Sequence, residues 1–143
     1  MIRLREVDLP DAALRQLKRW QDALAAVSDY DERVAVGQQQ FKQRNKRNNR
    51  TFAAVRRTLN AMAFGASCCW YCENPGANQI EHLWPKGLYP QFVFVWKNYL
   101  YICSPCNTTK LDQFAIFLNR DTARMERFQP RGTRGTLGKL QSS

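Results

Sequence analysis

Apolar residues recur at helical spacing along the first half of the chain. Over residues 8–27 they lie three or seven positions apart, a spacing that predicts a helix with one apolar face. The residues on that face are Leu14, Leu17, Leu24 and Val27. Asp8 stands where a helix N-cap is expected, and Pro10 suits a first helical turn.

Two further helices are expected before the chain changes character. The pattern over residues 31–46 is weak, whereas residues 50–63 carry apolar positions at intervals of three and four. Those positions are Phe52, Val55, Leu59 and Met62. Gly65 then stands where a glycine commonly ends a helix. Residues 43–50 are too polar to be core and are expected to form a junction or an exposed basic turn.

Residues 67–110 are rich in aromatic residues and cysteine, and they contain short segments typical of strands. Gln79–His82 and Tyr99–Ile102 are the two expected strands. A helix is expected after Cys106, because apolar residues return to helical spacing at Leu111, Phe114, Phe117 and Leu118. The chain from Gln129 onward is rich in glycine and arginine, which is typical of a flexible tail.

These segments predict an α+β protein in which helices precede a strand–loop–strand–helix unit. We expect a helical extension over residues 1–66, a core unit over residues 67–119 and a basic tail over residues 120–143. Apolar residues make up 44% of the 143, which is enough to bury a core. The N-terminus carries charges where a signal peptide needs an apolar run, and no stretch is long enough to span a membrane. A cytoplasmic protein is therefore expected.

The formal net charge is +10, and the charges are unevenly distributed along the chain. No acidic residue occurs between Arg33 and Cys72, although lysine and arginine are frequent there. Such a basic field attracts polyanions, yet a merely solvated surface would have the same composition, so charge alone leaves both readings open. The candidates for nucleic-acid binding in this stretch are Arg50, Arg56 and Arg57.

Four of the five cysteines form two pairs with two residues between the members of each pair. The pairs are Cys69 with Cys72 and Cys103 with Cys106. This spacing lets both thiolates of a pair reach one ion, and two pairs complete the tetrahedral sulfur site that suits zinc. Buried or redox-active cysteines are the alternative, and they account less well for a matched pair of motifs. With four protein ligands the zinc would be structural. Cys68 is the spare thiol and is expected to be a packed residue, although a Cys-x3-Cys spacing to Cys72 would let it replace Cys69 as a ligand.

His82 is the only histidine of the chain, and it lies between the two cysteine pairs. Taken alone, a single histidine is more often an ordinary, partly buried residue than a functional one. Its neighbours favour function, because Glu81 directly precedes it and Asn98 and Asn107 follow it. An imidazole, with a pKa near roughly 6.5, is well suited to accept a proton close to neutral pH.

Taken together, these motifs resemble the zinc-containing HNH endonucleases. The resemblance is carried by Cys-x2-Cys, Glu-His-x2-Pro-Lys, Trp-x-Asn and Cys-x2-Cys-Asn-x2-Lys in this order, and it covers residues 50–118. Within that family the chain is most similar to the small HNH proteins of bacterial anti-phage systems, of the Septu and retron-associated types. The family's fold implies a ββα-metal core that is pinned by the zinc of the four cysteines.

The resemblance also implies a role for each residue of the motif. His82 would be the general base that deprotonates the attacking water, and Asn98 would orient it through a hydrogen bond to its ring or backbone. Glu81 and Asn107 would bind a catalytic divalent ion, Mg2+ or Mn2+. The phosphate contacts would come from Lys86 and Lys110.

The expected function is therefore metal-dependent hydrolysis of phosphodiester bonds. DNA is the expected substrate, although the residues alone do not distinguish it from RNA. Membership of an anti-phage system implies an ATPase partner, which would dock on the helical segment 8–63. One site cuts one strand, so a double-strand break requires a homodimer or two encounters. The alternative is a zinc-ribbon module that binds nucleic acid without cutting it.

Overall fold

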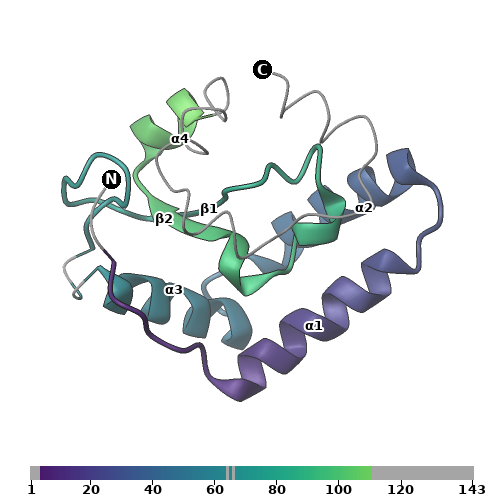
Figure 1. Cartoon of the computed structure of the whole chain (residues 1–143), viewed down its shortest axis with the longest axis horizontal. Coiled ribbons are helices and arrows are strands. Elements are labelled where there is room, and N and C mark those ends of the chain that lie inside the picture. Colours follow the sequence, from purple (N-terminus) through teal and green to yellow (C-terminus); the bar gives the residue numbers. More distant parts are fainter. Residues whose placement is uncertain (1–3, 64, 66, 111–143) are drawn as a thin grey trace.

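Within the described residues, three helices lead into a two-stranded antiparallel sheet, and a shorter helix follows it (Figure 1). The structure is a computed structural model, and it describes residues 4–63, 65 and 67–110. The helices are α1 (Asp11–Ala25), α2 (Tyr30–Arg44), α3 (Arg50–Met62) and α4 (Ser104–Lys110), and the strands are β1 (Gln79–His82) and β2 (Tyr99–Ile102). The expected α+β class and the bounds of both strands are confirmed.

Some of the expected elements lie outside the described residues. These are the apolar helical pattern over residues 111–118 and the basic segment 120–143, including the tail from Gln129. Among the described residues, none of the helices combines the length and the apolar character that crossing a membrane requires.

The first helix begins later than expected, at Asp11, and it has no side-chain cap, so the expectation of a cap at Asp8 was wrong. The cause is Pro10, because the residue before a proline is disfavoured in helical geometry and the helix cannot extend back past Leu9. The Pro10 carbonyl instead accepts the first free amides, those of Ala13 and Leu14, at 3.0 and 3.1 Å.

The next two helices begin at side-chain caps. Asp29 accepts the Glu32 amide at 2.9 Å at the start of α2, and Asn49 accepts the Phe52 amide at 3.1 Å at the start of α3. Beyond the end of α3, Gly65 takes a positive φ of 71° and its amide reaches the Asn60 carbonyl at 2.9 Å. Gly65 therefore ends the helix as expected, in a conformation that favours glycine.

An aromatic cluster holds the helices against the sheet. Phe52 of α3 is fully buried, with its ring 5.9 Å from Trp20 of α1, 5.4 Å from Phe41 of α2 and 6.1 Å from Tyr99 of β2. These rings belong to one continuous core that also includes Trp70 and other residues of the cysteine-bounded unit. The N-terminal helices and that unit therefore share one hydrophobic core.

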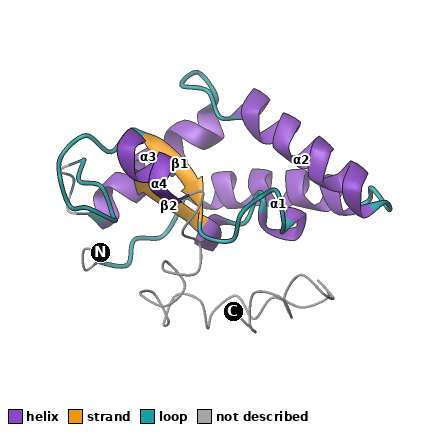
Figure 2. Ribbon diagram, turned by 90° about the horizontal axis from the view of Figure 1, so that it is seen from above, coloured by secondary structure: helices purple, strands orange, loops and turns teal. Residues whose placement is uncertain are grey.

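The sheet positions the residues of the motif. β1 and β2 pair antiparallel, with Glu81 opposite Leu100 and His82 opposite Tyr99, and the loop 83–98 joins them. α3 packs on β2 and α4 on β1, whereas α1 and α2 extend away from the sheet on one side (Figure 2). Successive side chains of a strand point to opposite faces, so the register sends His82 toward the helical core and Glu81 to the other face.

The shared aromatic core predicts that Phe52→Ala destabilises the whole described fold. We expect the free energy of unfolding to fall by about 3–5 kcal/mol, because the substitution leaves a cavity among three other rings. Leu14→Ala is the matched control, because Leu14 is 39% exposed and its truncation should cost less than about 1 kcal/mol. Urea unfolding followed by circular dichroism measures both values, and equal losses in the two variants would contradict the role of Phe52.

Candidate metal cluster and basic cleft

The two cysteine pairs come together at the end of the sheet where β1 begins and β2 ends. The sulfur atoms of Cys69, Cys72, Cys103 and Cys106 all lie within 4.8 Å of one another. The first pair lies on the turn that precedes β1, and the second lies directly after β2 at the start of α4. The arrangement joins segments more than thirty residues apart and can hold a metal ion such as zinc.

The electrostatics of the cluster favour a bound cation. Burial raises the pKa of Cys69, but amide hydrogen bonds from Cys72, Cys103 and Tyr71 outweigh it and bring the pKa to about 7. Burial raises the pKa of Cys106, and the hydrogen-bonded neighbouring sulfurs raise it further. Four sulfurs this close cannot all be anionic by themselves, so binding of a divalent cation would release the remaining protons.

Cys68 lies outside this cluster. Among the described residues the group of possible metal ligands contains the other four cysteines and not Cys68, which is half-buried. Its backbone instead forms an isolated bridge with Pro75. The choice of Cys69 over Cys68 as the ligand agrees with this geometry.

His82 is completely buried between two aromatic rings. Its ring lies edge-on to Phe41 at 4.5 Å and to Tyr99 at 5.4 Å, and its exposed fraction is 0%. Burial lowers the pKa of His82 below its ordinary value, although the neighbouring Glu81 carboxylate acts in the opposite direction. The imidazole is therefore held in its neutral form, the form that a base requires.

The hydrogen bonds of His82 fix which nitrogen carries the proton. Nε2 lies 3.0 Å from the Val93 carbonyl, and because a carbonyl only accepts, Nε2 is the protonated nitrogen and the donor. Nδ1 then carries the lone pair. It has no hydrogen-bond partner among the described residues, and Glu81 Oε1 lies 3.6 Å away. The ring thus presents an unused basic nitrogen toward Glu81.

None of the described hydrogen bonds joins Asn98 to the ring or to the backbone of His82, so the expected bond is not formed. Its Oδ1 accepts the Trp84 amide at 2.7 Å, while its Nδ2 donates to the carbonyls of Trp84 at 3.1 Å and Phe92 at 3.0 Å. Its own carbonyl accepts the Leu83 amide at 2.8 Å. Asn98 is fully buried, and its bonds tie the backbone that directly follows His82 to Phe92, the residue before Val93.

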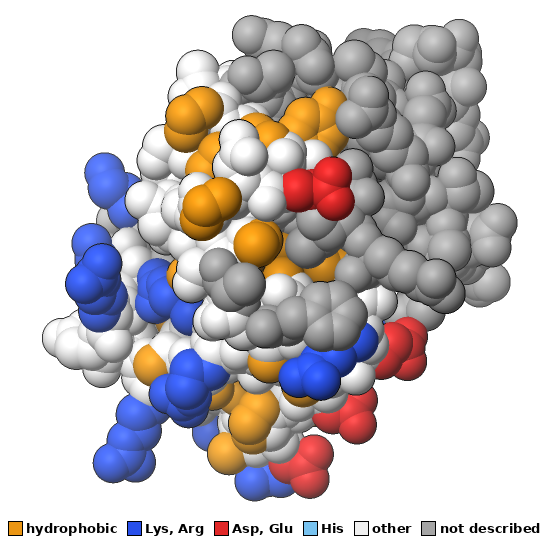
Figure 3. All heavy atoms as spheres, turned by 90° about the vertical axis from the view of Figure 1, so that its left-hand side faces the viewer, with side chains coloured by type: hydrophobic (Ala, Val, Ile, Leu, Met, Phe, Trp, Pro, Cys, Tyr) orange, Lys and Arg blue, Asp and Glu red, His pale blue; other side chains and the backbone are white. Residues whose placement is uncertain are grey.

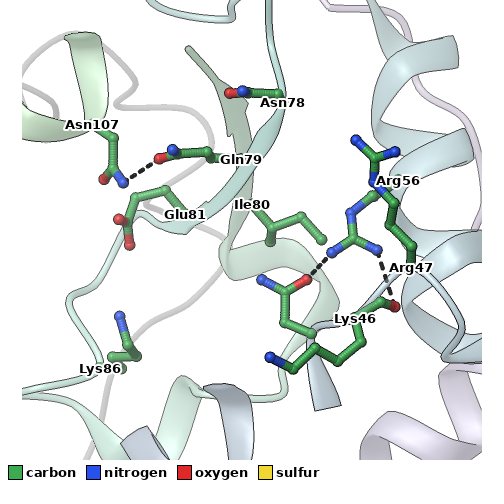
Figure 4. A pocket seen from close by; sticks show the side chains of 10 residues that line it. Lys46, Arg47, Arg56, Asn78, Gln79, Ile80, Glu81, Lys86 and Asn107 are labelled. Atoms are coloured by element: carbon green, nitrogen blue, oxygen red, sulfur yellow. Dashed lines mark hydrogen bonds between the residues drawn. The ribbon is translucent and has the colours of Figure 1, made fainter. Parts of the chain in front are cut away.

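Glu81 and Asn107 line the same cleft, whose volume is about 480 Å3 (Figure 4). The Glu81 carboxylate accepts the His82 amide at 2.8 Å. The Asn107 amide nitrogen donates to Gln79 Oε1 at 2.5 Å, and Gln79 also donates to the Ser104 hydroxyl at 2.8 Å. Asn107 Oδ1 is buried and has no partner within the described part of the chain. A carboxylate and an unused amide oxygen are ligands that suit a hard divalent cation.

The rest of the cleft is strongly basic. Its lining includes Arg56 and Lys86, and also Lys46 and Arg47 from the turn between α2 and α3. Lysine and arginine side chains gather along one side of the face shown in Figure 3, while most of its acidic side chains lie on the other side. The cleft therefore suits a polyanion.

Two of the expected nucleic-acid-binding residues lie elsewhere. Arg50 and Arg57 line a second groove of about 340 Å3 between α1 and α3, together with Arg15 and Arg19. Lys110 is the last residue of α4, and its side chain lies outside what the structure describes.

Sequence reasoning missed Gln79, Lys46 and Arg47 as residues of the site. Gln79 holds Asn107 against β1, and the two basic residues form the wall that faces Glu81. The run of basic and amide side chains over residues 43–50 was the available signal, but nothing in it shows which distant residues it faces. No protein-family model, curated protein or solved structure matches the chain, so its function is inferred from this geometry and from the motif.

The cysteine cluster predicts that one metal ion per chain depends on the four converging thiols. We expect Cys103→Ser to lose most of the bound metal and to lower the melting temperature by about 10 °C or more, because metal binding contributes directly to folding. Inductively coupled plasma mass spectrometry of the purified protein gives the metal content, and calorimetry gives the melting temperature.

Cys68→Ser is the matched control for this prediction. It removes a neighbouring thiol that takes no part in the cluster, so the metal content and melting temperature should stay at the wild-type values. Metal loss in the Cys68 variant, or full metal content in the Cys103 variant, would contradict the assignment of the ligands.

Proposed function

We propose that this protein is a metal-dependent HNH endonuclease that hydrolyses phosphodiester bonds of DNA. The observation that carries the proposal is the convergence of Glu81, Asn107 and a basic lining on one cleft, with the unused nitrogen of His82 beside Glu81. Each of these groups corresponds to a need of phosphodiester hydrolysis, which requires a base, a cation site and neutralised phosphate charge.

His82 would act as the general base through Nδ1. Donation from Nε2 to Val93 fixes the tautomer that leaves Nδ1 able to take a proton from water, and Tyr99 donates its hydroxyl to the same carbonyl at 2.9 Å. Because the ring is fully buried, water would reach Nδ1 only after a neighbouring group moves, and the Glu81 carboxylate, whose Oε1 lies 3.6 Å away, would be that group. A cation drawing Glu81 toward Asn107 would favour that movement.

Glu81 and Asn107 would hold the catalytic divalent ion, Mg2+ or Mn2+. Such an ion, when bound, neutralises charge on the phosphate and on the leaving oxygen. Gln79 keeps Asn107 in place for this task, because it accepts the amide hydrogen and leaves Oδ1 for a ligand role. Lys86 and Arg56 would contribute positive charge next to the bound phosphate.

The cysteine cluster would bind a structural zinc ion with no part in the chemistry. Cys106 directly precedes Asn107, so fixing its sulfur also fixes the start of the helix that carries the second ion ligand. In a bacterial anti-phage system, as the motif suggests, the chain would be the nuclease subunit of a complex with an ATPase. Cleavage of both strands would then need a homodimer or a second encounter.

The burial of His82 favours a second candidate, a zinc-containing module that binds nucleic acid without cutting it. A histidine fully enclosed by Phe41 and Tyr99 is also what a purely structural role in the core would require. This candidate uses the basic cleft and the cysteine cluster but gives Glu81 and Asn107 no ion to bind.

Plasmid cleavage distinguishes the two candidates. We expect the zinc-loaded wild-type protein to nick supercoiled DNA with Mg2+ or Mn2+, and His82→Ala to lower the rate by roughly 10²–10⁴-fold. His82→Gln is the second variant, since it fills more of the buried site. Circular dichroism and zinc content show whether each variant is folded.

A folded His82 variant that nicks DNA at the wild-type rate would contradict the assignment of His82 as the general base. A wild-type protein that binds the plasmid without nicking it would favour the non-catalytic module. Glu81→Gln, which keeps the size of the side chain, should lose cleavage and retain zinc, because it removes the ion ligand and spares the cysteines.

A further inference from the structure

The cleft has two walls that come from distant parts of the chain. One wall is formed by β1 and α4, with Glu81 and Asn107, and the other by α3 and the turn between α2 and α3 (Figure 4). Lys46 and Arg47 are the exposed basic residues of that turn. The turn between α2 and α3 precedes residues 50–118, the range over which the chain resembles a nuclease, whereas α3 lies within that range.

The charges of the cleft are unbalanced. Four cationic side chains line it, against the single carboxylate of Glu81. Within the described ranges, none of these four cations forms an ion pair, since the ion pairs there join Lys18 to Asp22 and His82 to Glu81. Arg56 is half-buried with only neutral oxygen atoms as hydrogen-bond partners, and burial lowers its pKa. The cleft therefore has positive charge available for an anion.

The turn is held in a defined shape. Arg56 donates to the Asn45 side-chain oxygen and to the Lys46 carbonyl, the second at 3.4 Å. The Asn49 amide donates to the same Lys46 carbonyl at 3.0 Å, and the Asn49 side chain caps α3. These bonds fix the backbone of the turn while the side chains of Lys46 and Arg47 stay exposed, so little ordering is needed when an anion binds.

We propose that Lys46 and Arg47 form a phosphate clamp for the backbone of a nucleic-acid strand lying in the cleft. Arg56 is the positioning residue of the clamp, because it ties the turn to α3. The clamp deepens the proposed function. Strand binding can be tested without cleavage, and only the further inference that the bound strand is also the one cut rests on the proposed nuclease activity. No aromatic side chain lines the cleft within the described residues, so base stacking contributes little and the clamp binds DNA without regard to its sequence.

The test measures binding to a short fluorescein-labelled DNA duplex by fluorescence anisotropy, with the zinc-loaded protein and no added Mg2+ or Mn2+. The slope of log affinity against log salt is negative, and each phosphate contact that is lost reduces its magnitude by about 0.9. We therefore expect Lys46→Gln/Arg47→Gln to reduce the magnitude of this slope by about 2, the change expected for the loss of two contacts. Binding at low salt should weaken by about tenfold or more.

The matched control is Lys18→Gln/Lys42→Gln, which removes the same charge from two exposed positions outside the cleft. Its slope should stay near the wild-type value. Equal slope changes in the two double variants would mean that DNA responds to the overall charge, and they would overturn the clamp. An unchanged slope in the Lys46/Arg47 variant would overturn it as well.

Arg56→Lys tests the positioning role separately. It keeps the charge but cannot donate to Asn45 and Lys46 as the guanidinium does, so binding should weaken while Arg56→Gln weakens it further. Wild-type affinity in Arg56→Lys would remove Arg56 from the proposal. Because these measurements do not involve cleavage, a clamp that fails here and a nuclease that fails in the plasmid assay are distinguishable results.

Discussion

The convergence of four cysteine sulfurs within 4.8 Å is the constraint on which the candidate site depends. Cys103 and Cys106 frame the start of α4, so fixing their sulfurs also fixes Asn107, the next residue. Gln79 completes the connection by binding both Ser104 and Asn107 from β1. The short sheet has too few residues to hold this geometry alone, because an isolated pair of strands is only marginally stable in water.

The N-terminal helices complete the site around the cysteine-fixed unit. Phe41 of α2 encloses the ring of His82, and the turn after α2 provides the basic wall of the cleft. The same enclosure has two effects on His82: it keeps the imidazole neutral, and it closes Nδ1 off from solvent. The proposed base is therefore neutral but closed off from water, and in the proposed mechanism a movement of the neighbouring Glu81 carboxylate would give it access.

The parts of the site that local spacing encodes could be predicted from the sequence, including the cysteine pairs and both strands. The α1 start at Asp11 was missed because Pro10 blocks the expected cap, and the partners of Asn98 depend on where the loop 83–98 folds back. Helical periodicity separates Arg56 from Arg57 by about 100°. Arg56 accordingly lines the basic cleft and Arg57 the second groove, but only the tertiary arrangement shows which of the two residues shares a cleft with Glu81.

We propose that the cysteine-fixed unit creates a second ion site at Glu81 and Asn107, distinct from the sulfur cluster. Anomalous diffraction from crystals of the zinc-loaded protein soaked in Mn2+ tests it most directly. We expect one zinc peak among the four sulfurs and one manganese peak between the side-chain oxygens of Glu81 and Asn107. A manganese peak that avoids both oxygens, or a cleft without manganese at saturating concentration, would contradict it.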